Sequence, residues 1–468
     1  MDRYLLLQPR DLESLAITKL ARWVALRAEE IVASASLKGL GRICLVLSEQ
    51  IEIVGNYLQD NVPRTFHDKL VAEIVLAFQK TDGSRRRNAA CDTTAMCRMM
   101  GKLTGVTRLK IKDIDEMHVI QLIGIFNNLK HLALPRCPIN VLRCIVNDCK
   151  LLETLHIDGE YFGLVDMTMD LLRELKHLRS IVLGRASTNA KGIERILLSC
   201  ENIEHIGTGY ANITAEALAS IVCSGERAGK RFRLKTYSAN GNTLEQLQLV
   251  VEVCPLIENL TLLYKCVRSN FMTLVGFKNL RELTLGWCHF YDDHVYELLE
   301  HVGYNLVHLD LHCDSVNLNA LMDISQTCPN LQSFSPNISG YMNPSSSETE
   351  LKIPPFRNLK KITLNLLFLR FSSSAPSLDE PILFLLSNSL NVEFLVFDKS
   401  FHISEDLMLK VMDANPFISL RELLVRTDNR AAQKSDIITA EVVGRFMRSP
   451  VSRPAVLVRT ERVRSCIR

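Results

Sequence analysis

The chain has 468 residues, of which 47% are hydrophobic and 23% charged, and its formal net charge is +3. This hydrophobic content suffices for a large core and excludes an intrinsically disordered chain. A net charge so close to neutral does not favour nucleic acid or an anionic membrane surface as a partner. We find no apolar run of the roughly eighteen residues that a membrane-spanning helix requires, so no membrane partner is expected.

The beginning of the chain, Met1 to Pro9, holds only a short apolar patch and no small-residue cleavage site, so it does not resemble a secretory signal. The 14 Cys therefore predict free thiols in a reducing compartment. We expect the protein in the cytoplasm, or also in the nucleus.

Residues 1–80 carry helical patterns, with apolar residues at helical spacing over 11–24, 43–58 and 67–78. Asp11 is suited to cap the first pattern, and Pro63 breaks the chain before the third. We predict a small helical module over 1–80. Residues 81–105 begin with a polar, basic run that includes Arg85, Arg86 and Arg87, and they are predicted as a linker and lead-in segment.

A short unit then recurs over 106–445, and its clearest copy runs from Leu280 to Cys288 in the pattern L-x-x-L-x-L-x-x-C. Alternating leucines predict a strand with one buried face, and the apolar residues between the strands predict helices. The spacing of the copies fits the period of leucine-rich repeats, which is roughly 20–29 residues. The first apolar positions are Val106, Leu129, Leu152, Leu178, Ile203, Leu234, Ile257, Leu280, Leu306, Leu331, Leu359, Val392 and Leu420.

The fold class that follows is α/β: a single elongated leucine-rich repeat solenoid with a curved parallel sheet on its concave side and helices outside, preceded by the helical module. Residues 446–468 are rich in Arg and are predicted as a basic tail that leaves the solenoid. The Arg-rich tail and the Arg triplet are interpreted as solvated segments, with nuclear targeting or weak anion binding as the alternative.

Cysteines precede several repeats at a fixed distance, as at Cys149, Cys200, Cys254 and Cys328, and others close a strand, as at Cys137 and Cys288. This pattern resembles the cysteine-containing, ribonuclease-inhibitor-like repeats of F-box and BC-box substrate receptors in cullin-RING ubiquitin ligases. We interpret the cysteines themselves as small buried hydrophobic residues.

The resemblance implies an adaptor-docking segment in the helical module. Leu12, Ala16 and Leu20 are similar to the spacing of a BC box, with Asp11 and Ala16 departing from its usual residues, and Val62-Pro63 is similar to the opening of a cullin box or F-box. The alternative is that these helices only cap the first repeat. The candidate adaptor-binding residues are Leu12, Leu15, Ala16, Leu20, Val62, Pro63 and Leu70.

Residues between the buried leucines of each strand must point to the concave face, where polar side chains suit protein recognition or simple solvation. His308, Asp310 and His312 have the residue types of a zinc site, but same-side positions lie about 7 Å apart in a strand, so solvated residues are favoured over a metal. The candidate partner-binding residues are His131, His156, Asp158, Asn259, Glu282, Thr284, His308, Asp310 and His312.

No phosphate loop, nucleophile elbow or metalloprotease motif is present, so an enzyme is not predicted, and neither is a cofactor. We expect a non-catalytic substrate receptor that binds an adaptor and cullin through its helices and a target protein through its concave face. The alternatives are a repeat scaffold or inhibitor with no link to ubiquitin, and an enzyme with a metal at His308 and His312.

Overall fold

The computed structural model describes residues 9–36, 40–81, 89–111, 116–158, 170–184, 189–208, 213–224, 231–240, 242–263, 271–338, 353–364, 379–398, 405–428 and 457–463. The chain divides into two compact units, Met1–Ile221 and Val222–Arg468. Among the described residues, no helix is both long and apolar enough to span a membrane.

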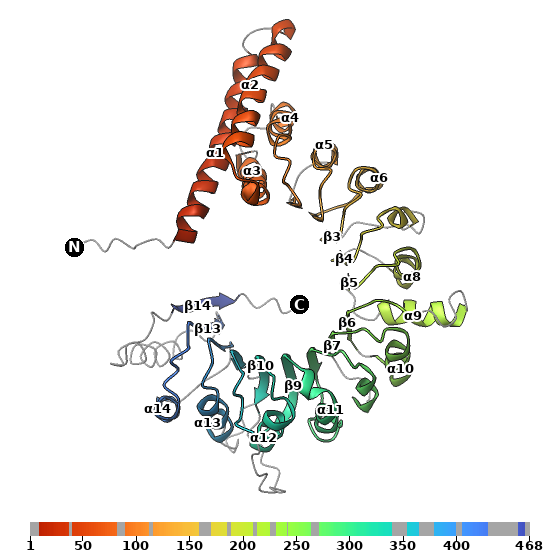
Figure 1. Cartoon of the computed structure of the whole chain (residues 1–468), viewed down its shortest axis with the longest axis vertical. Helices are drawn as coiled ribbons and strands as arrows, with labels where there is room; N and C mark the ends of the chain where they lie inside the picture. The colour runs from red at the N-terminus through yellow and green to blue at the C-terminus, as the bar shows by residue number, and fades with distance from the viewer. Residues whose placement is uncertain are drawn as a thin grey trace, which may run out of the picture. The chain divides into compact units, whose positions relative to one another are not determined.

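The first unit begins with a helical module in which α1 and α2 form an antiparallel pair (Figure 1), and α3 and α4 also pack against this pair. Its core contains Ala21 and Val24 of α1, Leu70 and Ile74 of α3, and Met99 of α4, all of them buried. The predicted linker therefore contributes a packed helix. The bounds are α1 Pro9–Ser36, α2 Leu40–Asn61, the 3₁₀ turn η1 Arg64–Phe66, α3 His67–Thr81 and α4 Ala89–Met100.

Five parallel strands follow in the first unit, in the order β1-β2-β3-β4-β5. Figure 1 shows these strands along the inner side of the unit and the repeat helices along its outer side. The elements are β1 Arg108–Lys110, α5 Glu116–Ile125, β2 His131–Leu134, α6 Ile139–Asp148, β3 Thr154–Ile157, η2 Asp170–Glu174, β4 Ser180–Leu183, α8 Ala190–Ser199, β5 His205–Thr208 and α9 Ile213–Ser224.

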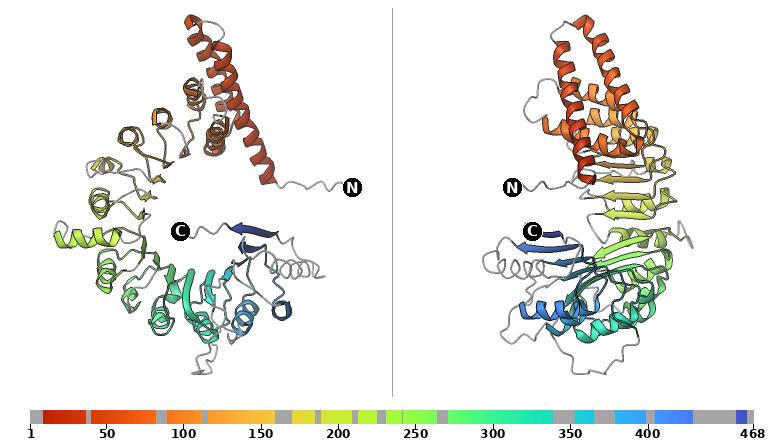
Figure 2. Two further views of the ribbon diagram at one scale, coloured as in Figure 1. Left: turned by 180° about the vertical axis from the view of Figure 1, so that it is seen from behind. Right: turned by 60° about the vertical axis from the view of Figure 1, so that its left-hand side comes forward.

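The second unit contains a nine-stranded parallel sheet from β6 to β14, again with strands inside and helices outside (Figure 2). Its elements are β6 Thr236–Asn240, α10 Leu244–Val253, β7 Asn259–Leu263, η3 Phe271–Gly276, β8 Glu282–Gly286, α11 Val295–Val302, η4 Gly303–Asn305, β9 His308–Val316, α12 Leu318–Thr327, β10 Ser333–Ile338, β11 Lys361–Leu364, α13 Asp379–Asn388, β12 Phe394–Phe397, α14 Glu405–Ala414, β13 Glu422–Asp428 and β14 Leu457–Val463.

The repeat pattern explains both sheets, and the leucine-rich repeat fold is the one predicted. All thirteen first apolar positions, from Val106 to Leu420, are at most 2% exposed. Cysteines end the repeat helices: Cys149, Cys200, Cys254 and Cys328 each follow a helix, and their backbone N–H groups donate to the carbonyl four residues earlier. Their thiols are buried, which confirms that they serve as small hydrophobic residues.

Two predictions about the repeat domain differ from the structure. The strands form two sheets, where one continuous sheet was predicted. The boundary between the two units falls within α9, in the repeat from Ile203 to Leu234, which is longer than the repeats before and after it. The prediction of a tail that leaves the solenoid is wrong for Leu457–Val463, which form β14 and pair in parallel with β13 over seven residues. Pairing satisfies backbone groups that the edge of β13 would otherwise expose, which is the physical reason for this strand.

Candidate functional site

The first candidate surface is the outward side of α1. Ile17, Ala21, Val24, Ala25, Ala28 and Ile31 form the buried side of this helix. With about 100° per residue, Leu15, Ala16, Trp23 and Leu26 project from the opposite side. All four are exposed, and Leu26 is 53% exposed. Leu15, Ala16 and Trp23 of the first predicted helix therefore lie outside the core of the module.

Helix α2 adds two exposed apolar side chains beside this face, Ile53 and Tyr57, which are 57% and 51% exposed. The rings of Trp23 and Tyr57 lie 6.0 Å apart between centroids, inclined at 59°. Single exposed apolar residues are ordinary, but here they gather on two adjoining helices. We call the set Leu15, Ala16, Trp23, Leu26, Ile53 and Tyr57 the outer apolar surface.

The predicted adaptor-binding residues differ in how far they are buried. Leu20 and Val62 are half-buried and Pro63 is exposed, whereas Leu70 is fully buried and belongs to the core of the module. The side chain of Leu12 lies outside the described residues, although its backbone is part of α1. Lys69 Nζ contacts Glu13 Oε1 at 3.0 Å and Ser14 Oγ at 3.1 Å, which holds the start of α3 against α1.

The inner side of the module caps the first repeat. Asp68 accepts hydrogen bonds from the backbone N–H of Thr107 at 2.6 Å, from its hydroxyl at 2.8 Å and from the N–H of Arg108 at 2.8 Å. His67 Nδ1 accepts from the N–H of Gly105 at 3.2 Å. These contacts satisfy backbone donors at the start of β1, at the free edge of the first sheet.

The predicted partner-binding residues lie on the strand face in register. Glu282 is opposite His308 and Thr284 is opposite Asp310 in the pairing of β8 with β9, and Asn259 is opposite Glu282 one strand earlier. In the first unit, His156 Nε2 lies 2.6 Å from Asp158 Oδ1. Of the predicted residues, Asp158 and Glu282 are exposed, whereas His131, His156, Asn259, Thr284, His308, Asp310 and His312 are half-buried.

Histidines on this face differ in their environments. Asp310, whose Oδ1 lies 3.3 Å from His312 Nε2, raises the pKa of His312 above its usual value, and the charge of Asp398 acts in the same direction. Burial and the nearby charge of Arg108 lower the pKa of His131. His312 therefore takes up a proton more readily than an isolated histidine does, and His131 less readily.

Trp287 adds an exposed aromatic side chain directly after β8, and it was not among the predicted site residues. It follows β8, has a left-handed φ of 57°, and is 49% exposed. Its N–H donates to the carbonyl of His312 at 3.0 Å. A left-handed conformation is costly for a bulky residue, and an exposed Trp is typical of binding hot spots.

The grouping of candidate metal ligands and the burial of the cysteine thiols decide whether the described residues hold a reactive arrangement. Over the described ranges, no three His, Cys, Asp or Glu side chains are grouped so as to hold a metal ion, and this includes His308, Asp310 and His312. Burial raises the pKa of Cys137, Cys149 and Cys254 to about 12. These thiols stay protonated near neutral pH, and a protonated thiol is a poor nucleophile.

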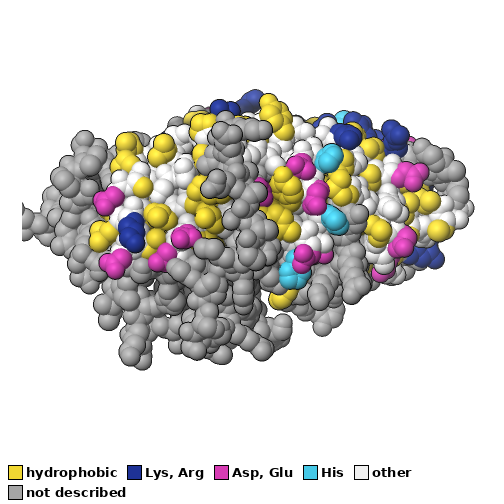
Figure 3. Space-filling view, turned by 90° about the horizontal axis from the view of Figure 1, so that it is seen from below, with side chains coloured by type: hydrophobic (Ala, Val, Ile, Leu, Met, Phe, Trp, Pro, Cys, Tyr) yellow, Lys and Arg dark blue, Asp and Glu magenta, His cyan; other side chains and the backbone are white. Residues whose placement is uncertain are grey.

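The outer, helical side of the second unit is mixed in character. Figure 3 shows hydrophobic, acidic and histidine side chains interspersed on the part of this face that the structure describes. Tyr291 donates to Asp323 at 2.9 Å, Tyr296 donates to Glu300 at 2.9 Å, and His294 lies 3.2 Å from Glu297. Asp323, Glu300 and Glu297 thus already have hydrogen-bonding neighbours.

A row of side chains just before the strands forms a third surface, which we call the amino edge. In the first unit the row holds Lys130 and Glu153, paired at 2.9 Å, and Arg179 and Glu204, paired at 3.7 Å. In the second unit it holds Lys235, Glu258, Arg281, Val307, Gln332, Lys360, Glu393 and Arg421. Opposite charges there pair at 3.9 Å between Lys235 and Glu258 and at 3.2 Å between Arg421 and Glu393.

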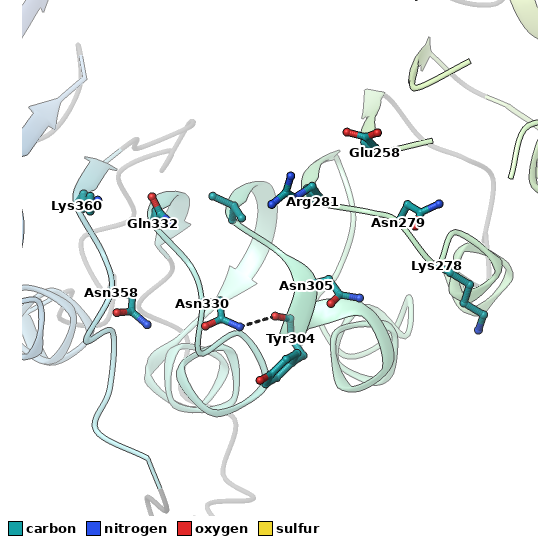
Figure 4. Close-up of a pocket in the computed structure, with 11 residues that line it drawn as sticks. Glu258, Lys278, Asn279, Arg281, Tyr304, Asn305, Asn330, Gln332, Asn358 and Lys360 are labelled. Atoms are coloured by element: carbon teal, nitrogen blue, oxygen red, sulfur yellow. Dashed lines mark hydrogen bonds between the residues drawn. The ribbon is translucent and has the colours of Figure 1, made fainter. Parts of the chain in front are cut away.

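The amino edge of the second unit borders an open cavity of about 770 Å³ (Figure 4). Its polar side chains lie in two rows, with Glu258, Arg281, Gln332 and Lys360 in one and Asn279, Asn305, Asn330 and Asn358 in the other. Tyr304, which is 69% exposed, lies beside the second row.

Asparagines of the second row also join neighbouring repeats. Asn330 Nδ2 donates to the carbonyl of Tyr304 at 2.9 Å, and Asn358 Nδ2 donates to that of Pro329 at 2.9 Å. Equivalent bonds are made by Asn128, Asn202 and Asn391. The sequence signal for this ladder is an Asn directly before the first apolar position of a repeat, and these Asn residues were not among the predicted site residues.

The comparisons with known proteins find a likeness among solved structures. No described protein family and no curated protein matches the sequence. Among solved structures, the chain is similar to the crystal structure of the complex of Rad7 and Elc1 in yeast, with 14% sequence identity and a TM-score of 0.48. The match covers 90% of this chain and 98% of that chain.

Proposed function

We propose that the protein is a non-catalytic substrate receptor of a cullin-RING ubiquitin ligase, which docks an adaptor through its helical module and binds a target protein on its strand face. The observation that carries this proposal is the outer apolar surface. Leu15 and Ala16 fall within the BC-box-like segment of α1, and both are exposed.

Capping of the solenoid does not account for this surface. The contacts to the first repeat are made by α3, through His67 and Asp68, and by α4, which packs against α5. An apolar face on a helix that already has its own buried face fits docking of that helix into the hydrophobic groove of a partner. The exposed rings of Trp23 and Tyr57 are the residue types that anchor such contacts.

The strand face fits the receptor half of the proposal. Polar side chains in register on neighbouring strands offer a broad set of donors and acceptors. Trp287, which directly follows β8, adds an exposed aromatic side chain. We propose a cytoplasmic or nuclear location, because most of the described cysteines are free and buried, which suits a reducing compartment.

Affinity purification of the full chain from cells tests the adaptor half. The double variant Leu15→Glu/Ala16→Glu adds two charges to the outer apolar surface, and both substituted residues are exposed. It should abolish recovery of an elongin-type or Skp-type adaptor and of a cullin. Gln59→Glu, which adds one charge at an exposed position of α2, is the matched control and should leave recovery unchanged. Recovery of neither adaptor by the unmodified chain would contradict the proposal.

A repeat scaffold or inhibitor is the second candidate, and the capping bonds of Asp68 favour it because they give the module a structural role. In that case the two substitutions at Leu15 and Ala16 should leave every recovered partner unchanged. If the double variant loses a partner although its thermal unfolding temperature equals that of the unmodified chain, the module is not purely structural.

A further inference from the structure

We propose that the amino edge of the second unit binds an acidic, extended peptide segment of a partner protein. The starting observation is a break in the row of alternating charges. Val307 and Gln332 stand where the alternation would place charged residues, and the cations on either side, Arg281 and Lys360, have no acidic partner within 4.0 Å among the described residues.

The break coincides with the cavity. Arg281, Val307, Gln332 and Lys360 all line it, together with the amides of the Asn row and with Lys278. Glu258 is the acidic residue in the lining, and Lys235 lies 3.9 Å from it. The cavity thus presents cations at separated points and neutral amides between them, which favours a ligand with separated negative charges.

The spacing of the cations sets the length of the ligand. Backbone bonds link the row one strand at a time: Val307 N–H donates to Arg281 O at 2.8 Å, Gln332 N–H to Val307 O at 2.9 Å, and Lys360 N–H to Gln332 O at 2.8 Å. Arg281 and Lys360 are therefore three strand spacings apart, roughly 14 Å. An extended peptide covers this distance in about four residues, and residues four apart point to the same side.

Amides between the cations suit a peptide backbone. Gln332, Asn305 and Asn330 offer both donors and acceptors, and these match the N–H and C=O groups of the residues between two acidic side chains. A single-stranded nucleic acid fits less well, because it needs stacking platforms and a continuous cationic track, whereas the lining has one aromatic ring, Tyr304, and a carboxylate.

Fluorescence anisotropy of the full chain with a labelled peptide tests the proposal. The probe is three Glu-Gly-Ser-Gly repeats, which places Glu at every fourth position, and the reference peptide has the same composition with its Glu residues adjacent. Arg281→Ser/Lys360→Ser should raise the Kd of the probe about tenfold, since each exposed charge contributes modestly. The spaced probe should bind more tightly than the reference peptide.

The matched control is Lys130→Ser/Arg179→Ser, which removes one Lys and one Arg from the same row where each has an acidic partner. This control should change the Kd less than twofold. Equal weakening by both double variants, no weakening by either, or tighter binding of a single-stranded oligonucleotide of equal charge would overturn the proposal. The proposal does not rest on adaptor docking, and adaptor recovery by Arg281→Ser/Lys360→Ser should match that of the unmodified chain.

Discussion

Replacing Asp68 by Ala should loosen the attachment of the helical module to the first repeat. The substitution removes three hydrogen bonds to one carboxylate and leaves the N–H groups of Thr107 and Arg108 without their acceptor. Hydrogen bonds to charged groups contribute about 1.5–3 kcal/mol each, but water can bond some of the freed groups in the variant. We therefore expect the free energy of local opening to fall by about 2–4 kcal/mol.

Hydrogen exchange read by mass spectrometry measures this loss directly. Amides of α3 and β1 should exchange roughly 30–1000-fold faster in Asp68→Ala, because each 1.4 kcal/mol corresponds to a factor of ten. Asp68→Asn should have a smaller effect, since the remaining carbonyl oxygen can still accept both backbone N–H groups. Asp60→Ala, at an exposed position of α2, is the control. Unchanged exchange in β1 of Asp68→Ala would refute the capping role.

Three further changes test packing and electrostatics. Gly303→Ala should lower the thermal unfolding temperature of the second unit, because a Cβ there would lie 2.7 Å from the carbonyl oxygen of Thr327, and overpacking of this kind costs about 1–3 kcal/mol. Leu70→Ala should destabilise the helical module by about 2–5 kcal/mol in urea unfolding, since the side chain is fully buried. The pKa of His312, measured by NMR titration, should lie above its usual value of 6.5, and Asp310→Asn should lower it. The stability that protonated His312 contributes is therefore present below pH 6.5 and is lost as the pH rises through the folded pKa.

The repeat fold could be predicted because its pattern is local and periodic. Each strand has its buried residues at fixed offsets, so Leu283 and Leu285 alone indicate which face of β8 is buried, and the structure places both at 0% exposure. The strand residues that point outward follow from the same alternation. Hence the positions of His308, Asp310 and His312 on one face were predictable from the sequence.

The surfaces could not be predicted to the same depth, because they depend on which elements pack together. The pattern in α1 indicates an apolar side at Leu15 and Trp23, but small residues such as Ala21 and Ala25 form the buried side, and their burial follows from helix packing. Likewise, the charges of the amino edge are separated by whole repeats in the sequence. The register of the sheets brings Lys130 next to Glu153 and Arg421 next to Glu393.

The most direct test of the central proposal is a binding measurement with purified components. Isothermal titration of the full chain with an elongin-type adaptor and with a Skp-type adaptor should give a defined complex with one of them. Leu15→Glu/Ala16→Glu should abolish this complex, while Gln59→Glu should bind as the unmodified chain does. Binding of neither adaptor by the folded, unmodified chain, or equal binding by the double variant, would contradict docking through the outer apolar surface.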